Sequence, residues 1–173
     1  MKTLIEILQS VARYAEAYAE IQSIQEESPL IPEGDQKTGC IGELYGYLYL
    51  AHANPGATLT YGSHSEKGWD IECKSDRTSK RIQIKTVSAF SKTRTISPIH
   101  HGWDELFIIY LDRKLAPTGF WIITDTSIVA HGEVRKGCKC RDPEKAGTGS
   151  PTLPFGENRI ADLQNAIIAK KAT

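Results

Sequence analysis

The sequence lacks any long hydrophobic run, and no apolar stretch approaches the roughly 18 residues that a membrane-spanning helix requires. A signal-peptide pattern is also missing from its first residues, so we expect a cytoplasmic protein with no membrane partner. None of its four cysteines forms a C-x-x-C pair, which argues against a redox motif and favours reduced thiols. The close spacing of Cys138 and Cys140 leaves one alternative open, a zinc site shared with His131.

Net charge is absent as well, because 21 basic residues balance 21 acidic ones. The balance alone argues against a nucleic-acid partner, but the two signs are separated along the chain. Residues 1–66 hold three basic and nine acidic residues, whereas residues 67–145 hold fifteen basic and ten acidic ones. Local basic patches attract phosphate whatever the total charge, and they can equally form a plain solvated surface. The candidates for contact with nucleic acid are Lys74, Arg81, Lys92, Arg94, Arg135, Lys136, Lys139 and Arg141.

What is present suits one globular domain: 173 residues, of which 40% are hydrophobic and 24% charged. Hydrophobic spacing predicts helices over 3–25 (within an N-terminal segment 1–30), 37–53 and 157–171. Alternating or continuous apolar runs predict strands at 58–61, 69–73, 81–87, 106–111 and 120–123. We expect a short helix or edge strand at 126–130 and a long, basic, Gly/Pro-rich loop at 135–156. This order predicts a single α/β domain over 1–173, a central mixed β-sheet flanked by helices.

Polar side chains interrupt two of the predicted strands. Asp70 stands within an apolar strand, and Gln83 and Lys85 lie two residues apart on the next strand, so that both leave the same face. If the two strands form a hairpin, these three side chains converge. A carboxylate, an amide oxygen and an ammonium together suit a hard cation such as Mg²⁺, which binds through one or two carboxylates, waters and substrate phosphates. The lysine can orient or help deprotonate a water and offset negative charge.

A third acid is expected from a neighbouring element. Glu43 is the candidate, because it lies among apolar residues of the second predicted helix, where a carboxylate needs a partner. Glu72 follows Asp70 by two residues and shares its face of the strand. It is either an auxiliary metal ligand or a surface acid paired with Lys74 or Arg81, and the sequence leaves both interpretations open.

The order of these groups resembles the PD-(D/E)XK nuclease superfamily, which has the restriction-endonuclease-like fold. That family has an acid on an early helix, an Asp that opens one strand, and an x-x-Lys signature on the next strand. The segment Gln83-Ile84-Lys85 resembles the Gln-x-Lys variant of the last motif, and Trp69 stands where the family usually has Pro. Residues 103–112 resemble the next core strand, so the resemblance covers about residues 37–125, the expected catalytic core.

The resemblance implies a Mg²⁺-dependent endonuclease acting on double-stranded DNA, with Mn²⁺ as a substitute. It makes Glu43, Asp70, Gln83 and Lys85 catalytic, with the metal held by Glu43, Asp70, Gln83 and the Ile84 backbone carbonyl. Cutting both strands with so small a chain implies a homodimer, and restriction, defence and repair are all compatible. The neutral Gln83 suggests an alternative, a catalytically impaired nucleic-acid-binding or protein-interaction module of the same fold. The zero net charge suggests a third, a structural protein without a nucleic-acid role.

Overall fold

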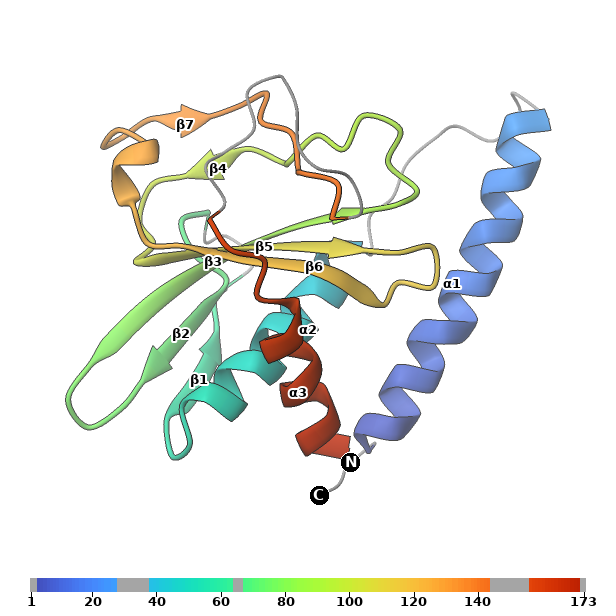
Figure 1. Ribbon diagram of the computed structural model, residues 1–173. Coiled ribbons are helices and arrows are strands. Elements are labelled where there is room, and N and C mark those ends of the chain that lie inside the picture. Colours follow the sequence, from blue (N-terminus) through green and yellow to red (C-terminus); the bar gives the residue numbers. More distant parts are fainter. Residues whose placement is uncertain (1–2, 28–37, 64–66, 144–155, 172–173) are drawn as a thin grey trace.

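A computed structural model describes residues 3–27, 38–63, 67–143 and 156–171, and its centre is a five-stranded sheet (Figure 1). The strand order is β1-β2-β3-β5-β6, and all neighbours are antiparallel except β3 and β5, which are parallel. The prediction of a mixed α/β fold with a central sheet flanked by helices is therefore confirmed. The strands are β1 (Thr58–Tyr61), β2 (Ile71–Lys74), β3 (Ser79–Ser88), β5 (Glu105–Leu111) and β6 (Pro117–Ile123).

Helices α2 (Thr38–Ala53) and α3 (Ile160–Lys171) lie on one side of the sheet, below it in Figure 1, and α1 (Leu4–Glu27) stands beside the end of the sheet and reaches above and below its level. Helix α2 lies directly on β3, and two glycines allow this close approach. A Cβ atom at Gly42 would overlap the Thr86 side chain, and one at Gly46 would meet the Ile84 side chain. The small residues of α2 therefore set how near the helix backbone, and with it Glu43, comes to the central strand.

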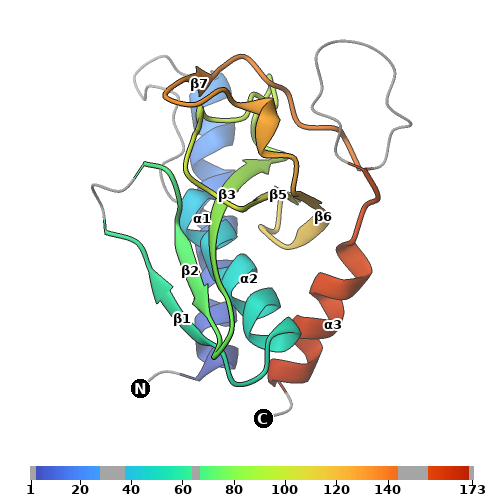
Figure 2. The same cartoon turned by 90° about the vertical axis from the view of Figure 1, so that its left-hand side faces the viewer.

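The other face of the sheet is covered by a small β-layer. It is visible above the sheet in Figure 1 and at the top of Figure 2, where β7 is labelled. It contains β4 (Ile99–His100) paired with β7 (Val134–Arg135), together with the 3-10 helix η1 (Thr126–Ile128). The sheet thus separates two buried clusters. One includes Ile82, Ile84, Phe107 and Tyr49 on the helix side, and the other includes Val87, Ile99, Trp103, Ile108 and Trp121 on the β4–β7 side.

Cys138 and Cys140 are buried in the second cluster rather than arranged around a metal. Burial raises the pKa of the Cys140 thiol to about 12, so this thiol stays protonated. His131 instead packs edge-on against His101, with ring centroids 4.4 Å apart. Within the described residues no group of three or more His, Cys, Asp or Glu side chains could hold a metal ion. The zinc alternative from the sequence is therefore not supported.

The predicted helices and strands are found with modest shifts at their ends. Helix α3 begins at Ile160 because the Asn158 side chain accepts the Ile160 N–H, at 3.2 Å, and the Phe120 N–H, at 3.0 Å. Strands β4 and β7 were not predicted. They arise because residues 135–143 pack against the chain after β3, with Ile96 N–H donating to the Cys138 carbonyl at 2.8 Å. The rest of the predicted loop, 144–155, lies outside the described residues.

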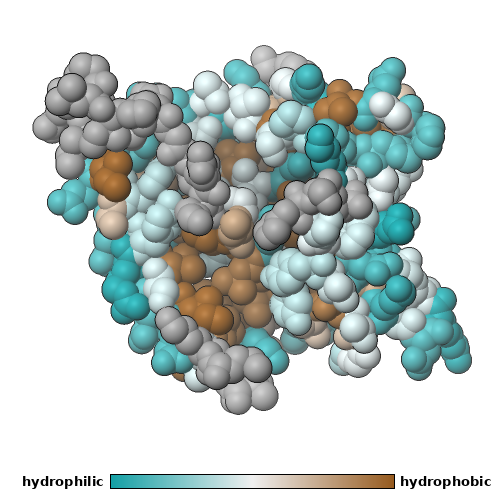
Figure 3. Space-filling view, turned by 180° about the vertical axis from the view of Figure 1, so that it is seen from behind, coloured by the Kyte–Doolittle hydropathy of each residue, from teal (hydrophilic) through white to brown (hydrophobic). Residues whose placement is uncertain are grey.

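The back of the molecule shows a band of apolar surface beside α1 (Figure 3). Helix α1 contacts the body through one stripe, in which Ala15 and Tyr18 are buried and Tyr18 packs edge-on against Phe90. Leu8 and Val11 of the same helix are partly buried and pack against the helix-side cluster. Among the described residues, the search for a helix that is both long enough and apolar enough to cross a membrane found none.

Candidate functional site

Strand β3 positions two of the predicted site residues. Its even-numbered Ile82 and Ile84 point into the cluster on the helix side, so Gln83 and Lys85 leave the opposite face, as the alternation predicts. Gln83 is only 1% exposed, and Lys85 is partly buried. A lysine and an amide at neighbouring positions inside a sheet face are unusual, because burying polar groups costs free energy unless they are paired.

Asp70 lies just before β2 and is held at the edge of β3. Its backbone N–H donates to the Ile82 carbonyl at 2.8 Å, and its carboxylate oxygen Oδ2 accepts the Ile84 N–H at 2.6 Å. The β2–β3 ladder ends at the pair Ile71 and Ile82. Because the N–H and C=O of one strand residue point to the same side, the Ile84 carbonyl also faces the side of Asp70. Asp70 therefore lies next to the Ile84 backbone, and their role as metal ligands stays a prediction.

Lys85 connects the two acids electrostatically. Burial lowers the pKa of the Lys85 ammonium, while the negative charges of Asp70 and Glu43 act in the opposite direction. Both carboxylates therefore lie within electrostatic reach of this one lysine, although they come from different elements. Glu43 belongs to the part of α2 that Gly42 brings against Thr86. The structure thus brings Glu43, Asp70 and Lys85 together, from a helix, a strand edge and the central strand.

Gln83 makes three hydrogen bonds to backbone groups. Its Nε2 donates to the carbonyls of Lys67 and Gly68, both at 2.9 Å, and its Oε1 accepts the His100 N–H at 3.2 Å. The side chain thus ties the segment before Asp70 to β4. Its carbonyl oxygen has a second lone pair, so the predicted role as a metal ligand stays a prediction.

Glu72 accepts hydrogen bonds from Ser79 Oγ at 2.9 Å and from Lys74 Nζ at 3.4 Å. These bonds lower the pKa of its carboxyl, with the Ser79 hydroxyl as the largest cause. Of the two interpretations that the sequence left open, the structure favours the surface acid paired with Lys74.

The donor set around Lys85 suits a hard cation with an incomplete protein shell. Glu43 and Asp70 supply two carboxylates and Ile84 a carbonyl oxygen that faces the Asp70 side. Mg²⁺ keeps several waters and binds through one or two carboxylates plus substrate phosphate oxygens. A complete cage of protein ligands is therefore not needed, and these residues fit the ion.

Two further residues, His100 and Tyr61, lie near the site and are not among the predicted site residues. Burial lowers the pKa of His100, and the positive charges of Lys85, Lys67 and Lys136 lower it further. Three lysines from three segments therefore lie within electrostatic reach of His100 in β4. No spacing rule joins Lys67 and Lys136 to Lys85, because β7 reaches this face only through its pairing with β4. Tyr61 lies within electrostatic reach of Glu43. Burial, and after it the negative charge of Glu43, raises the pKa of the Tyr61 hydroxyl to about 12, so the hydroxyl stays neutral.

The predicted nucleic-acid contacts are dispersed, and several are already engaged. Arg81 lies over the Trp69 ring, 5.6 Å from its centroid, and Arg94 Nη1 is 3.2 Å from a carboxylate oxygen of Asp142. Arg135 donates to the Ile128 carbonyl at 3.0 Å, and the Nε atom of Arg141 is buried. The lysines of the set are exposed at Lys74, Lys92, Lys136 and Lys139. The lysines therefore present most of the accessible charge of this set.

No protein-family model matches the sequence, and no curated protein matches it either. Similar solved structures include a bacterial homing endonuclease, I-Ssp6803I, with 14% sequence identity and a TM-score of 0.44. The match covers 82% of this chain and 100% of that chain. The similarity is weak.

Proposed function

We propose that this chain is a metal-dependent phosphodiester hydrolase of the PD-(D/E)XK type, a DNA endonuclease that uses Mg²⁺ or Mn²⁺. The observation that supports it best is a partly buried lysine within electrostatic reach of two carboxylates from separate elements. Burial disfavours the charged form of a lysine, and perturbed titratable groups with specific charge partners cluster at functional sites.

Each residue has a separate task in this proposal. Glu43 and Asp70 would hold the cation, with help from the Ile84 carbonyl and the Gln83 amide oxygen. When bound, the cation would polarise the scissile phosphate and acidify a bound water. Lys85 holds an ammonium that orients this water and offsets the charge developing on the phosphate oxygens. The hydrogen bond from Ile84 N–H to Asp70 fixes that carboxylate before any ligand arrives.

The test is cleavage of supercoiled plasmid by the purified chain with Mg²⁺, with Mn²⁺, and with a chelator. We expect nicking that needs the metal and that falls by at least about 100-fold in Lys85→Ala, in line with the loss of a group that positions or activates the nucleophile. Lys170→Ala, an exposed residue at the end of α3, is the matched control for removing one lysine. Equal cleavage by the wild type and Lys85→Ala would overturn the mechanism.

A second candidate function follows from the hydrogen bonds of Gln83. Because its amide is engaged by three backbone groups and carries no charge, it contributes less to metal affinity than an Asp or Glu would. We infer as the alternative a DNA-binding module that does not cut. Salt-sensitive binding of duplex DNA without metal-dependent cleavage would support it.

We also propose that the active form is a homodimer in the cytoplasm. The described chain places one Lys85 site on each copy, and duplex cleavage needs two cuts. Whether the protein serves restriction, defence or repair depends on the DNA substrate that it cuts. Light scattering with and without a short duplex measures the stoichiometry, and a strict 1:1 complex that still makes double-strand breaks would contradict the dimer.

A further inference from the structure

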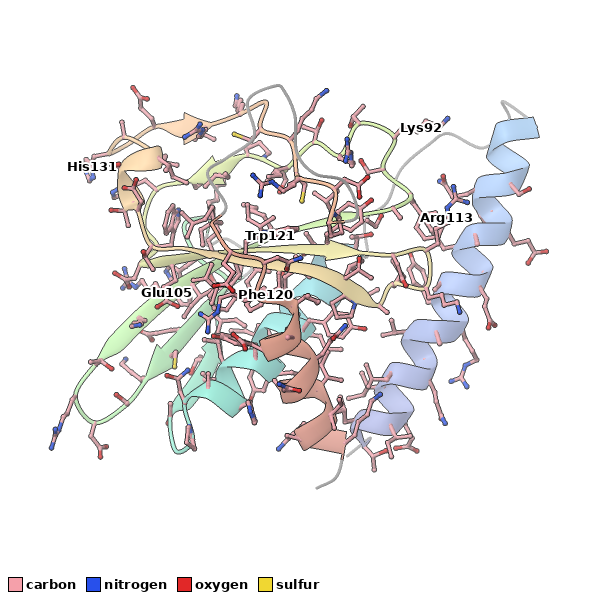
Figure 4. All side chains as sticks on the ribbon, viewed as in Figure 1. Lys92, Glu105, Arg113, Phe120, Trp121 and His131 are labelled. Atoms are coloured by element: carbon pink, nitrogen blue, oxygen red, sulfur yellow. The ribbon has the colours of Figure 1, made fainter. Side chains whose placement is uncertain are left out.

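A concavity whose lining residues differ from those of the candidate site lies at the end of the sheet next to α1. It has a volume of about 340 Å³ and is lined by Gln22 and Ser23 of α1, by Phe90 and Lys92 after β3, and by Arg113 in the turn after β5. Figure 4 shows Lys92 and Arg113 on neighbouring loops that face the upper half of α1. We call this the α1 cleft.

The chemistry of the α1 cleft suits an anion. Two exposed cations face it from different loops, an amide and a hydroxyl face it from the helix, and none of its described lining residues is acidic. The floor holds Arg113 in place, because its guanidinium lies over the Phe90 ring, 5.9 Å from the centroid. Tyr18 in turn packs edge-on against Phe90 at 4.5 Å. A planar guanidinium fixed beside a lysine is well suited to a phosphate group.

The position of the α1 cleft relates it to the candidate site. Ala89, another lining residue, directly follows β3, four residues after Lys85. At roughly 3.3 Å per residue the two positions are about 13 Å apart along the strand. Phosphates follow one another about every 3.4 Å of helix axis on each DNA strand, so one short duplex is long enough to contact both positions.

We propose that the α1 cleft binds a phosphate group. Resting on the proposed function, we assign this phosphate to the backbone of the same DNA whose scissile phosphate is held at Asp70 and Lys85. The cleft would then fix the direction in which the duplex leaves the site. A free phosphate or nucleotide is the other source of the same chemistry, and the experiment separates the two.

The test uses the full chain with Lys92→Gln and Arg113→Gln combined. The matched control combines Lys170→Gln and Lys171→Gln, which removes two exposed positive charges from the end of α3. A second control, Lys114→Gln, lies in the same turn as Arg113 but outside the cleft lining. One probe is a fluorescent 20-base-pair duplex over a series of NaCl concentrations, and the other is inorganic phosphate titrated against the isotope-labelled protein and followed by NMR.

We expect the cleft variant to bind the duplex about tenfold more weakly and to lower the slope of log affinity against log salt by about 0.9, the value for one lost phosphate contact. Both controls should keep the slope close to that of the wild type. Phosphate should shift the resonances of Lys92 and Arg113 in the wild type and in both controls, in which the cleft is intact.

The outcomes separate this inference from the proposed function. If the cleft variant and the controls bind DNA alike but phosphate still shifts the cleft resonances, the cleft takes a free phosphate and the DNA assignment is wrong. If neither probe distinguishes the cleft variant, the phosphate site is overturned while wild-type DNA binding still supports the proposed function. If the wild type binds no duplex, the proposed function fails and the phosphate titration alone decides on the cleft.

Discussion

The two faces of the central sheet are built on different principles. On the helix side, Ile82 and Ile84 pack against α2 in an apolar cluster, and glycines bring the helix close. On the β4–β7 side, Gln83 and Lys85 share the face with Val87, and a buried amide supports the loop before Asp70. Apolar packing fills both faces, but on the β4–β7 face the hydrogen bonds of Gln83 add a polar link that the helix face around Ile82 and Ile84 does not have. The candidate site lies where the two meet, since Glu43 comes from the helix side.

The largest expected effect is on the polar face. Gln83→Leu leaves the buried Gly68 carbonyl and the part-buried Lys67 carbonyl and His100 N–H without their partner, and each buried unsatisfied group costs about 1–3 kcal/mol. We expect the free energy of unfolding to fall by about 3–5 kcal/mol in urea denaturation. The control on the opposite face is Ile82→Val, a truncation that costs about 0.5–1.5 kcal/mol. A loss for Gln83→Leu no larger than that of Ile82→Val would mean that the amide does not hold this face together.

A related change, Gln83→Glu, separates the two roles of this residue. A carboxylate cannot donate to the Lys67 and Gly68 carbonyls, so the backbone role predicts a destabilisation of about 2–4 kcal/mol. The metal role predicts tighter binding of Mn²⁺, measured by calorimetry, because a charge is added. A variant as stable as the wild type with unchanged Mn²⁺ affinity would contradict both.

On the helix face the sharpest change is Gly42→Ala, whose methyl would overlap the Thr86 side chain. We expect a loss of about 1–3 kcal/mol from overpacking, together with reduced cleavage because Glu43 moves with the helix. Gly39→Ala is the matched control in the same helix, since nothing lies within 4 Å of a Cβ there. It should gain up to about 1 kcal/mol. Equal behaviour of the two variants would show that α2 does not approach β3 so closely.

The smallest expected effect is a pH dependence from His100. Its pKa in the folded chain is lowered from 6.5, first by burial and then by Lys85, Lys67 and Lys136, so the unfolded chain binds the proton more readily. Stability attributable to His100 is therefore present above pH 6.5 and is lost as the pH falls through this value toward the folded pKa. Between pH 7.5 and 5.5 the wild type should lose more stability than His100→Asn in urea titrations.

His52→Asn, which removes an exposed imidazole from the last turn of α2, is the control for this titration. If His100→Asn is as acid-sensitive as the wild type, the lysines do not act on His100 in the folded chain.

Local patterns in the sequence predicted much of the fold correctly. The strand at 58–61 has the predicted limits, and β3, β5 and β6 extend the predicted runs by one to three residues at their ends. Short-range hydrophobic patterns work for β3, β5 and β6 because one or both of their faces are buried, whereas the strand at 58–61 is largely exposed. The β4–β7 pair was missed because each strand is two residues long and leaves no alternating pattern to detect.

By itself, the sequence determined that Gln83 and Lys85 share a face, because the side-chain period of a strand is two, and it predicted that Asp70, near the preceding strand, would converge on them if the two strands form a hairpin. The tertiary structure alone decided what these groups meet. It brought Glu43 from α2 to Lys85, placed three lysines within electrostatic reach of His100, and engaged Gln83 with backbone partners. The physical reason is that such contacts join distant segments through the packing of layers, and no local spacing encodes which hydrogen-bond partner a buried polar group will find.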